Sequence, residues 1–249
     1  MNFTVLTLFP ELLDLFFNHG MISQGIKKKL ISGNSINIRD FSTDRHNTVD
    51  DRPYGGGSGM VMKPAILQTS ILHAKKKYPK SKVILLTPQG TQFNQDKAKE
   101  FARQCSGLIF VCGRYEGIDE RLFADHIDED ISIGDYVMTN GELASMVIID
   151  STARLIPGVL GNQESYKSDS FFNDRLEYAQ YTRPEEFEGL RVPDVLLSGN
   201  HEKIRLWRKK SSLQRTFLKR PDLFNKKDLD KEEKTIIKQW VQELEALIK

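Results

Sequence analysis

The stretch Leu108-Ile109-Phe110-Val111-Cys112-Gly113-Arg114-Tyr115-Glu116-Gly117 decides the fold class, because an apolar run of strand length passes directly into a glycine turn. A second run, Val83-Ile84-Leu85-Leu86, leads in the same way into Thr87-Pro88-Gln89-Gly90. Continuous apolar runs of this length are typical of parallel strands that are buried on both faces. The two stretches therefore predict a parallel sheet whose strands end in turns.

Helix-length patterns separate the apolar runs over the first 155 residues. Pro64 is placed to open a helix that runs to Tyr78, and Asn94 to cap one that runs to Gln104. Further helices are expected from Glu11 and over Glu142 to Leu155, and extended segments at Val5–Phe9, 36–38 and 127–133. This alternation predicts an α/β domain with a mostly parallel sheet and helices on both faces.

The pattern changes after residue 156. Pro157 and Gly158 end the last helix, and residues 161–170 are polar without apolar periodicity, which predicts a flexible linker. Amphipathic helices are expected over Asn200–Phe217 and Leu229–Ile248, with no strand between them. We therefore expect a first domain over 1–160, a linker over 161–170 and a small all-helical domain over 171–249.

Composition excludes several classes of protein. The chain has 249 residues, with 36 Lys and Arg against 34 Asp and Glu, so its net charge of +2 indicates no global affinity for nucleic acid. Its two cysteines and five histidines show no metal-ligand spacing, so no metal site is predicted. The first ten residues carry no basic leader, and no apolar run approaches membrane length. These features predict a soluble, cytoplasmic protein without a membrane partner.

Three turns follow the expected strands, at 87–90, at 112–117 and from Ile133 through Gly141. Carboxyl ends of parallel strands meet at one edge of a sheet, where small molecules bind, although any one of these glycines could simply end a strand. Neither a dinucleotide fingerprint nor a Walker A loop is present. The glycine-rich stretch Tyr54–Met60 is open to two interpretations, a flexible flap or a surface linker.

Charge is uneven along the chain. Residues 113–135 hold eight acids against two arginines, and Glu116 is the acid best placed on a ligand turn to meet a cation. Residues 201–220 hold eight Lys or Arg against one Glu. At helical spacing, one face collects Arg205, Arg208, Lys209, Arg215 and Lys219. Such a face fits a polyanion backbone, and RNA is favoured over DNA because no groove-reading motif is present.

Longer motifs then point to a family. They are Phe9-Pro10-Glu11, Asp50-Asp51-Arg52-Pro53-Tyr54-Gly55-Gly56-Gly57, Leu86-Thr87-Pro88-Gln89-Gly90, Cys112 through Arg121, Ser132-Ile133-Gly134-Asp135-Tyr136-Val137, Arg154 through Gly161, Tyr181-Thr182-Arg183-Pro184 and Leu197-Ser198-Gly199-Asn200-His201. In these motifs, which span nearly the whole chain, the sequence resembles the bacterial tRNA (guanine-N1)-methyltransferases of the knotted SPOUT class.

The resemblance implies a trefoil knot that binds S-adenosyl-L-methionine, and a homodimer whose active sites use both chains. It implies methylation of N1 of the guanosine at tRNA position 37, beside the anticodon. The cofactor-binding residues implied are Leu86, Thr87, Pro88, Gly113, Tyr115, Ser132, Ile133, Gly134, Asp135, Tyr136, Val137, Met138 and Gly141. Together with the basic face, it marks Gly59, Arg183, Asn200, His201, Arg205, Arg208 and Lys209 as tRNA-binding.

The chemistry needs a base and a cation. N1 of neutral guanine carries a proton that must leave before the nitrogen can attack, and negative charge then develops on O6. By resemblance, Asp169 is the general base, Arg154 stabilises O6, and Glu116 supports cofactor and substrate. If Asp169 reaches a site on the other subunit, the linker should order only when tRNA docks.

Alternatives stay open at this point. A knotted 2′-O-methyltransferase would share the cofactor turns, a non-catalytic RNA-binding module would need only the basic helix, and a doubly wound nucleotide-binding enzyme lacks its phosphate motif. Two positions depart from the family pattern, with Ser58 in place of a proline and Asn140 in place of a glycine. The residues do not decide whether Mg²⁺ takes part.

Overall fold

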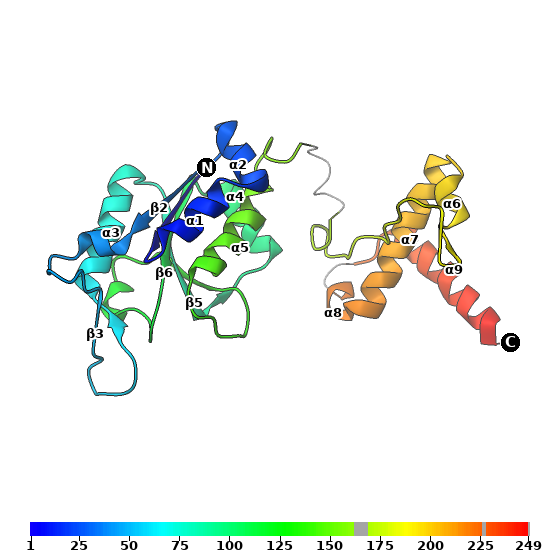
Figure 1. The fold of residues 1–249 in the computed structure, drawn as a ribbon. Coiled ribbons are helices and arrows are strands. Elements are labelled where there is room, and N and C mark those ends of the chain that lie inside the picture. The colour runs from blue at the N-terminus through cyan, green and yellow to red at the C-terminus, as the bar shows by residue number, and fades with distance from the viewer. Residues whose placement is uncertain (162–168, 226–227, 249) are drawn as a thin grey trace. The chain divides into compact units, whose positions relative to one another are not determined.

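The chain divides into two compact units, residues 1–163 and 164–249. The structure is a computed structural model and describes residues 1–161, 169–225 and 228–248 (Figure 1). The predicted linker over 161–170 spans the division between the units, and its residues 162–168 lie outside the described residues.

A five-stranded parallel sheet forms the centre of the N-terminal unit, in the order β2-β1-β6-β5-β7. Its strands are β1 (Asn2–Thr7), β2 (Ser32–Asn37), β5 (Lys82–Gln92), β6 (Gly107–Cys112) and β7 (Glu129–Ser132). Strand β6 lies in the middle of the sheet and is buried along its whole length. The parallel sheet that the apolar runs predicted is therefore confirmed.

Helices cover both faces of this sheet, also as predicted. They are α1 (Pro10–Phe17), α2 (Gly20–Lys27), α3 (Pro64–Lys77), α4 (Gln95–Gln104) and α5 (Glu142–Ala153), with short 3₁₀ helices at Ile38–Phe41 and Glu120–Leu122. Helix α3 begins at Pro64, whose missing N–H costs nothing in a first turn. Helix α4 is capped by Asn94, whose side-chain oxygen accepts from the backbone N–H of Lys97 at 3.0 Å. Helix α2 was not predicted.

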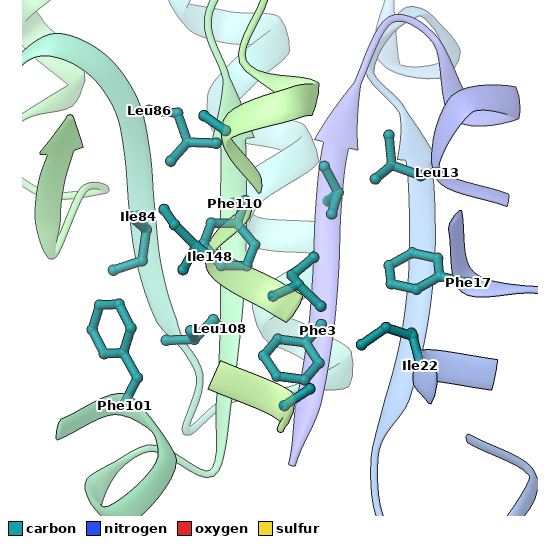
Figure 2. Packing of buried hydrophobic residues seen from close by; sticks show 14 of the residues in the cluster. Phe3, Leu13, Phe17, Ile22, Ile84, Leu86, Phe101, Leu108, Phe110 and Ile148 are labelled. Carbon is teal, nitrogen blue, oxygen red and sulfur yellow. The ribbon is translucent and has the colours of Figure 1, made fainter. Parts of the chain in front are cut away.

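The sheet separates two hydrophobic clusters because successive side chains of a strand point to opposite faces. Leu108 and Phe110 of β6 pack with Phe3 and with residues of α1, α2, α4 and α5 (Figure 2). Ile109 and Val111 pack on the other face, against α3. A strand that must serve both clusters can carry no polar side chain, which explains its uninterrupted apolar run.

Strand β5 differs from the prediction, because it does not end at Leu86. Its pairing with β6 stops at Leu86, but pairing with β7 resumes at Thr91 after a register shift. The intervening residues include Pro88, which has no N–H to give to a ladder. The expected turn at 87–90 is therefore an irregularity within one long strand, and it still leaves these residues at the edge of the sheet.

The C-terminal unit contains the two long helices that the sequence predicted. Its helices are α6 (Asp194–Leu197), α7 (His201–Lys219), α8 (Pro221–Phe224) and α9 (Lys231–Ile248). A short antiparallel hairpin, β8 (Glu186–Phe187) with β9 (Leu190–Arg191), precedes them. The expectation of an all-helical unit therefore needs this one correction, because two-residue strands are too short to give an alternating pattern.

Replacing Phe110 by alanine tests the central position of β6. Its ring is fully buried in the larger cluster, so Phe110→Ala should lower the free energy of unfolding of the N-terminal unit by about 3–5 kcal/mol. Leu72→Ala is the control, because the Leu72 side chain is 53% exposed on α3 and should cost far less. Urea unfolding followed by circular dichroism measures both, and equal losses would contradict this account of the core.

Candidate active site

A cavity of about 280 Å³ lies at the irregularity of β5 and at the carboxyl ends of β6 and β7. Its walls come from three segments, 85–89, 113–118 and 131–141, together with Ala144 of α5. These are the three regions in which the sequence predicted ligand turns, and parallel pairing brings them to one edge. The cavity belongs wholly to the N-terminal unit.

Most residues expected to bind the cofactor line this cavity. They are Leu86, Thr87, Pro88, Gly113, Tyr115, Ser132, Ile133, Gly134, Tyr136, Val137, Met138 and Gly141, whereas Asp135 is not among the lining residues. Glu116 also lines it. The cavity is also lined by residues of the predicted ligand turns that were not among the expected cofactor-binding residues, namely Gln89, Arg114, Gly117, Thr139 and Asn140. The lining residues outside those turns were missed, namely Leu85, Ile118, Ile131 and Ala144. Their position next to predicted residues was the only signal that could have found them.

The segment after β6 leaves regular structure in a strained turn. Tyr115 has a φ of 59° and Gly117 a φ of 116°, both on the left-handed side of the map. Such a conformation is costly for a tyrosine and persists where surrounding contacts hold it, as at ligand sites. The turn places Glu116 on the cavity wall, with its side chain exposed rather than buried.

The glycine-rich stretch is attached to this same turn. It closes a small hairpin between β3 (Asp50–Asp51) and β4 (Val61–Met62). Met60 accepts a hydrogen bond from the backbone N–H of Glu116 at 2.9 Å, and Met62 donates one to Gly117 at 3.0 Å. A methyl group at Gly59 would overlap the Glu116 carboxylate. The stretch is thus the end of a hairpin whose base is fixed to the Glu116 turn.

The innermost wall depends on a close contact between β6 and α5. A Cβ at Gly141 would lie 2.9 Å from the Cα of Cys112, closer than real Cβ atoms approach backbone. Gly141 precedes the first residue of α5, so the absent side chain lets the helix begin directly against the strand end. The contact holds the backbone of Gly113 and Gly141 on one wall of the cavity.

A buried carboxylate lies beneath this wall. Glu142, the first residue of α5, is only 2% exposed, and one of its oxygens accepts a hydrogen bond from Thr7 at the end of β1. Its Oε2 has no hydrogen-bond partner among the described residues. The neighbouring Cys112 thiol is fully buried, and burial, with the Glu142 charge second, raises its pKa well above the ordinary value. The thiol is therefore held in its neutral form.

The two departures from the family pattern cause no backbone strain. Asn140 and Ser58 both have negative φ, although the glycines around Ser58 do not. The side-chain Oδ1 of Asn140 is buried in the cavity wall without a hydrogen-bond partner among the described residues. Asn140 therefore supplies an unsatisfied acceptor where a glycine would supply none.

The remaining two expected catalytic residues lie in different units. Arg154 is the exposed C-cap of α5 in the N-terminal unit. Asp169 belongs to the C-terminal unit and is half-buried, and its carbonyl accepts from the backbone N–H of Phe172 at 3.3 Å. The expected general base and the expected O6-stabilising cation therefore belong to separate compact units.

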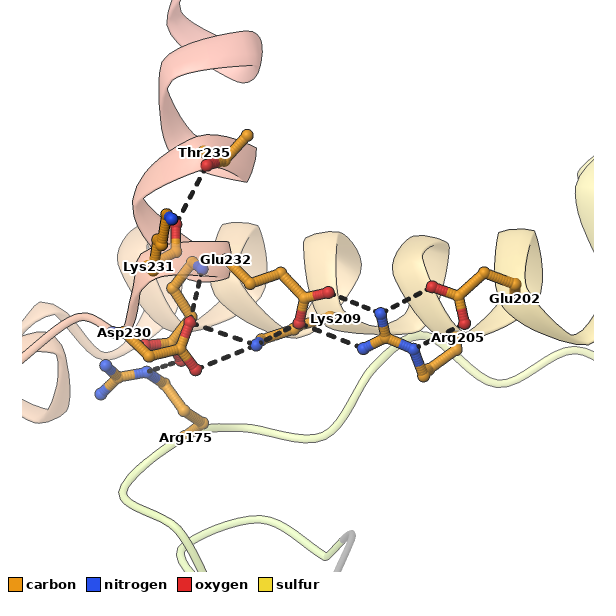
Figure 3. A network of polar contacts seen from close by, with 9 residues as sticks. Arg175, Glu202, Arg205, Lys209, Asp230, Lys231, Glu232 and Thr235 are labelled. Carbon is orange, nitrogen blue, oxygen red and sulfur yellow. Dashed lines mark hydrogen bonds and ion pairs between the residues drawn. The ribbon is translucent and has the colours of Figure 1, made fainter.

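Two of the five cations of the basic face predicted for α7, Arg205 and Lys209, are paired with carboxylates (Figure 3). Arg205 pairs with Glu202 and Glu232, and Lys209 pairs with Asp230 and Glu232. Hydrogen bonds from these two cations lower the pKa of Glu232 to about 2. The pairs with Asp230 and Glu232 could not be foreseen because these acids lie more than twenty residues away in the sequence.

Other residues expected to bind tRNA are differently engaged. Asn200 caps α7 by accepting from the backbone N–H of Lys203, and His201 is the exposed first residue of that helix. Arg208 lies over the Tyr178 ring, 4.9 Å from its centroid. Among the residues that the structure describes, Arg183 and Arg208 form no ion pair with a carboxylate.

Comparison with known proteins now identifies the family. The family described as tRNA (guanine-1)-methyltransferase TrmD matches residues 1–226. The chain is 52% identical to the tRNA (guanine-N(1)-)-methyltransferase of Clostridium botulinum strain Hall, over 98% of this chain and 100% of the relative. It is 48% identical to the protein of that name from Desulfatibacillum aliphaticivorans, over 100% of this chain and 95% of the relative. This chain belongs to the TrmD family.

The described residues of this TrmD family member hold neither a candidate metal site nor a helix that could span a membrane. Over 1–161, 169–225 and 228–248, no group of three or more His, Cys, Asp or Glu side chains is placed to hold a metal ion. No helix within these same ranges has both the length and the apolar character to cross a bilayer.

Gly141→Ala should disturb the cavity of this TrmD family member. The added methyl must push α5 away from Cys112, so we expect binding of the family's methyl donor to weaken by at least tenfold and stability to fall. Gly161→Ala is the matched control, because a Cβ there meets nothing within 4 Å. Isothermal titration calorimetry and thermal unfolding measure the two effects. Wild-type binding by Gly141→Ala would contradict this description of the wall.

The two thiols should differ in reactivity. Cys112 is fully buried with a raised pKa, so at pH 8 it should resist iodoacetamide in the folded protein and react only after denaturation. Cys105 is partly exposed, and burial raises its pKa less, so it should be modified first. Peptide mass spectrometry measures the order, and rapid native labelling of Cys112 would contradict it.

Proposed function

We propose that this chain transfers a methyl group from S-adenosyl-L-methionine to N1 of the guanosine at tRNA position 37. The observation that carries the proposal is the cavity itself, which gathers the family's three ligand segments and Glu116 at one sheet edge. The relatives are named tRNA (guanine-N(1)-)-methyltransferases, which supports tRNA as the substrate. The donor, the position in tRNA and the residue roles are our proposal.

The cavity fits a donor of this kind. Gly113, Gly134 and Gly141 leave backbone on its walls, Leu86, Ile133 and Met138 provide apolar surface, and Asn140 Oδ1 is an acceptor for an N–H group. S-adenosyl-L-methionine supplies an electrophilic methyl group on a positively charged sulfur. The Glu116 carboxylate on the wall stabilises that charge by Coulomb attraction and is anchored through the backbone of Met60.

The reaction requires that guanine lose its N1 proton. In the proposed mechanism the Asp169 carboxylate accepts this proton as general base, and the Arg154 guanidinium stabilises the negative charge that develops on O6. Because Asp169 and Arg154 belong to different units, the site is completed only when the C-terminal unit contributes Asp169.

We further propose that Asp169 comes from the partner chain of a homodimer, and that docking of tRNA brings it to the site. Exclusion of a wrong substrate then follows, because the base is delivered only when tRNA is bound. The trefoil knot and a location in the cytoplasm, where tRNA is modified, belong to the same proposal.

Labelled S-adenosyl-L-methionine and two tRNA transcripts that differ only in the guanosine at position 37 test the function. We expect label in the guanosine transcript alone, and N1-methylguanosine in its nuclease digest. Label on a ribose 2′ oxygen would instead support the knotted 2′-O-methyltransferase. Binding of tRNA without any transfer, insensitive to the donor, would support a non-catalytic RNA-binding module.

Asp169→Ala tests the general base. Turnover should fall by about 10²- to 10⁴-fold while donor affinity stays unchanged, because Asp169 acts on the guanine rather than on the donor. Glu177→Ala is the matched control, since Glu177 is an exposed acid in the same segment. Single-turnover assays and calorimetry separate the two quantities. Full turnover by Asp169→Ala would remove this residue from the mechanism.

A further inference from the structure

A second cavity, of about 610 Å³, lies in the C-terminal unit. It is bounded by the segment before the β8–β9 hairpin, by α6 and by one side of α7. The lining is aromatic and cationic, with Tyr178, Tyr181, Trp207, Arg183 and Arg208. The resemblance to the family marks Arg183 and Arg208 as tRNA-binding, but it gives no role to the cavity itself or to the aromatic rings of Tyr181 and Trp207.

The aromatic side chains of the cavity are available for stacking. Tyr181 lies beside Trp207, with ring centroids 6.1 Å apart and planes inclined by 60°. The Tyr181 side chain is 50% exposed, so much of its surface faces solvent. A flat apolar ligand that covered this ring would remove water from it without displacing a protein partner.

The charges around the cavity are uncompensated. Elsewhere in the unit, Arg175, Arg191, Arg205 and Arg220 each pair with a carboxylate, whereas Arg215 has no such pair among the described residues. Arg183 and Arg208 form no such pair among the described residues, although both line the cavity. The one acid in the lining, Glu185, is bound by Arg191 at 2.6 Å. The cavity therefore combines exposed aromatic surface with two guanidinium groups that lack an anion.

We propose that this cavity receives one unpaired nucleotide of the bound tRNA, with its base stacked on Tyr181 beside Trp207 and its phosphate bound by Arg183 and Arg208. Aromatic rings that stack bases beside cations that hold the backbone are the usual means of binding single-stranded nucleic acid. A paired base could not enter, because both its faces are already stacked. The inference rests on the proposed function only in taking tRNA as the ligand.

The structure also revises which cations hold the tRNA. Arg205 and Lys209 already have carboxylate partners in α9, so binding a phosphate would require them to leave those pairs. Arg208, one position before Lys209, points instead to the cavity, with its guanidinium over Tyr178. The strongest phosphate contacts of α7 are therefore expected on its cavity side.

A double-mutant cycle tests the proposal. One partner is Tyr181→Ala, and the other is a set of tRNA transcripts in which each unpaired loop nucleotide in turn lacks its base. Tyr181→Ala should weaken binding of unmodified tRNA about tenfold or more, and Tyr181→Phe should bind nearly as the wild type. At one loop position, removal of the base should weaken binding to the wild type as much as Tyr181→Ala weakens binding of unmodified tRNA. Removal of the same base should not weaken binding to Tyr181→Ala any further. Additive losses at every position would overturn the proposal.

Control variants separate this from other effects. Phe187→Ala removes an aromatic ring that lies outside the cavity and is even more exposed than Tyr181, at 64%, and it should leave tRNA binding unchanged. Arg183→Ala should reduce the salt dependence of binding by about one phosphate contact, whereas Lys210→Ala, whose amine is paired with Glu243, should not. If Tyr181→Ala altered only the oligomeric state in sedimentation, the cavity would be a contact between copies of this chain, and the proposal would fail.

Binding and methylation are measured separately, so the two proposals can fail separately. Coupling between Tyr181 and one nucleotide, in an enzyme that methylates another atom, would uphold the cavity and refute the reaction. Methylation of guanine N1 without coupling between Tyr181 and any nucleotide would uphold the proposed reaction and refute the role of the cavity.

Discussion

Parallel pairing of β5, β6 and β7 is the constraint on which the candidate active site depends. It brings three segments that are far apart in the sequence to one edge, where they enclose the cavity. The close contact of Gly141 with Cys112 then fixes the start of α5 against the end of β6. Buried below, the hydrogen bond between Glu142 and Thr7 joins the same helix to β1. The base of the cavity is thus built on the sheet and α5, whereas the Glu116 turn and the irregular segment 133–141 complete its walls.

The C-terminal unit follows a different principle, because its buried core is small. Leu213, Leu223 and Ile236 are the buried apolar residues of its helices, and charged groups make much of the contact between α7 and α9. Exposed ion pairs contribute little stability each, but here they decide which cations stay available. Pairing with α9 occupies Arg205 and Lys209, and leaves Arg183 and Arg208 beside the aromatic cavity.

Local signals predicted the N-terminal unit well and the C-terminal unit less well. Pro64 and Asn94 act within a single helical turn, so their effects could be foreseen, as could the burial of β6 from its uninterrupted apolar run. The continuation of β5 past Pro88 could not be foreseen from the sequence, because it depends on pairing with β7, forty residues later in the chain. The two-residue strands of the β8–β9 hairpin carry no periodicity at all. In the site, Leu85 and Ala144 were missed because they lie outside the predicted turns, and only the folded walls reveal that they face the cavity.

By itself the sequence determined the alternation of strand and helix, the parallel sheet, the division into two parts and, through its long motifs, the family. These properties follow from composition, spacing and short contacts, which are written along the chain in order. Tertiary structure alone decided that β5 continues past Pro88 to pair with β7, that Glu232 of α9 neutralises part of the basic face of α7, and that Arg183 and Arg208 share a cavity with Tyr181 and Trp207. The physical reason is that Coulomb attraction and burial depend on distance in space, and residues remote in the chain acquire that distance only by folding.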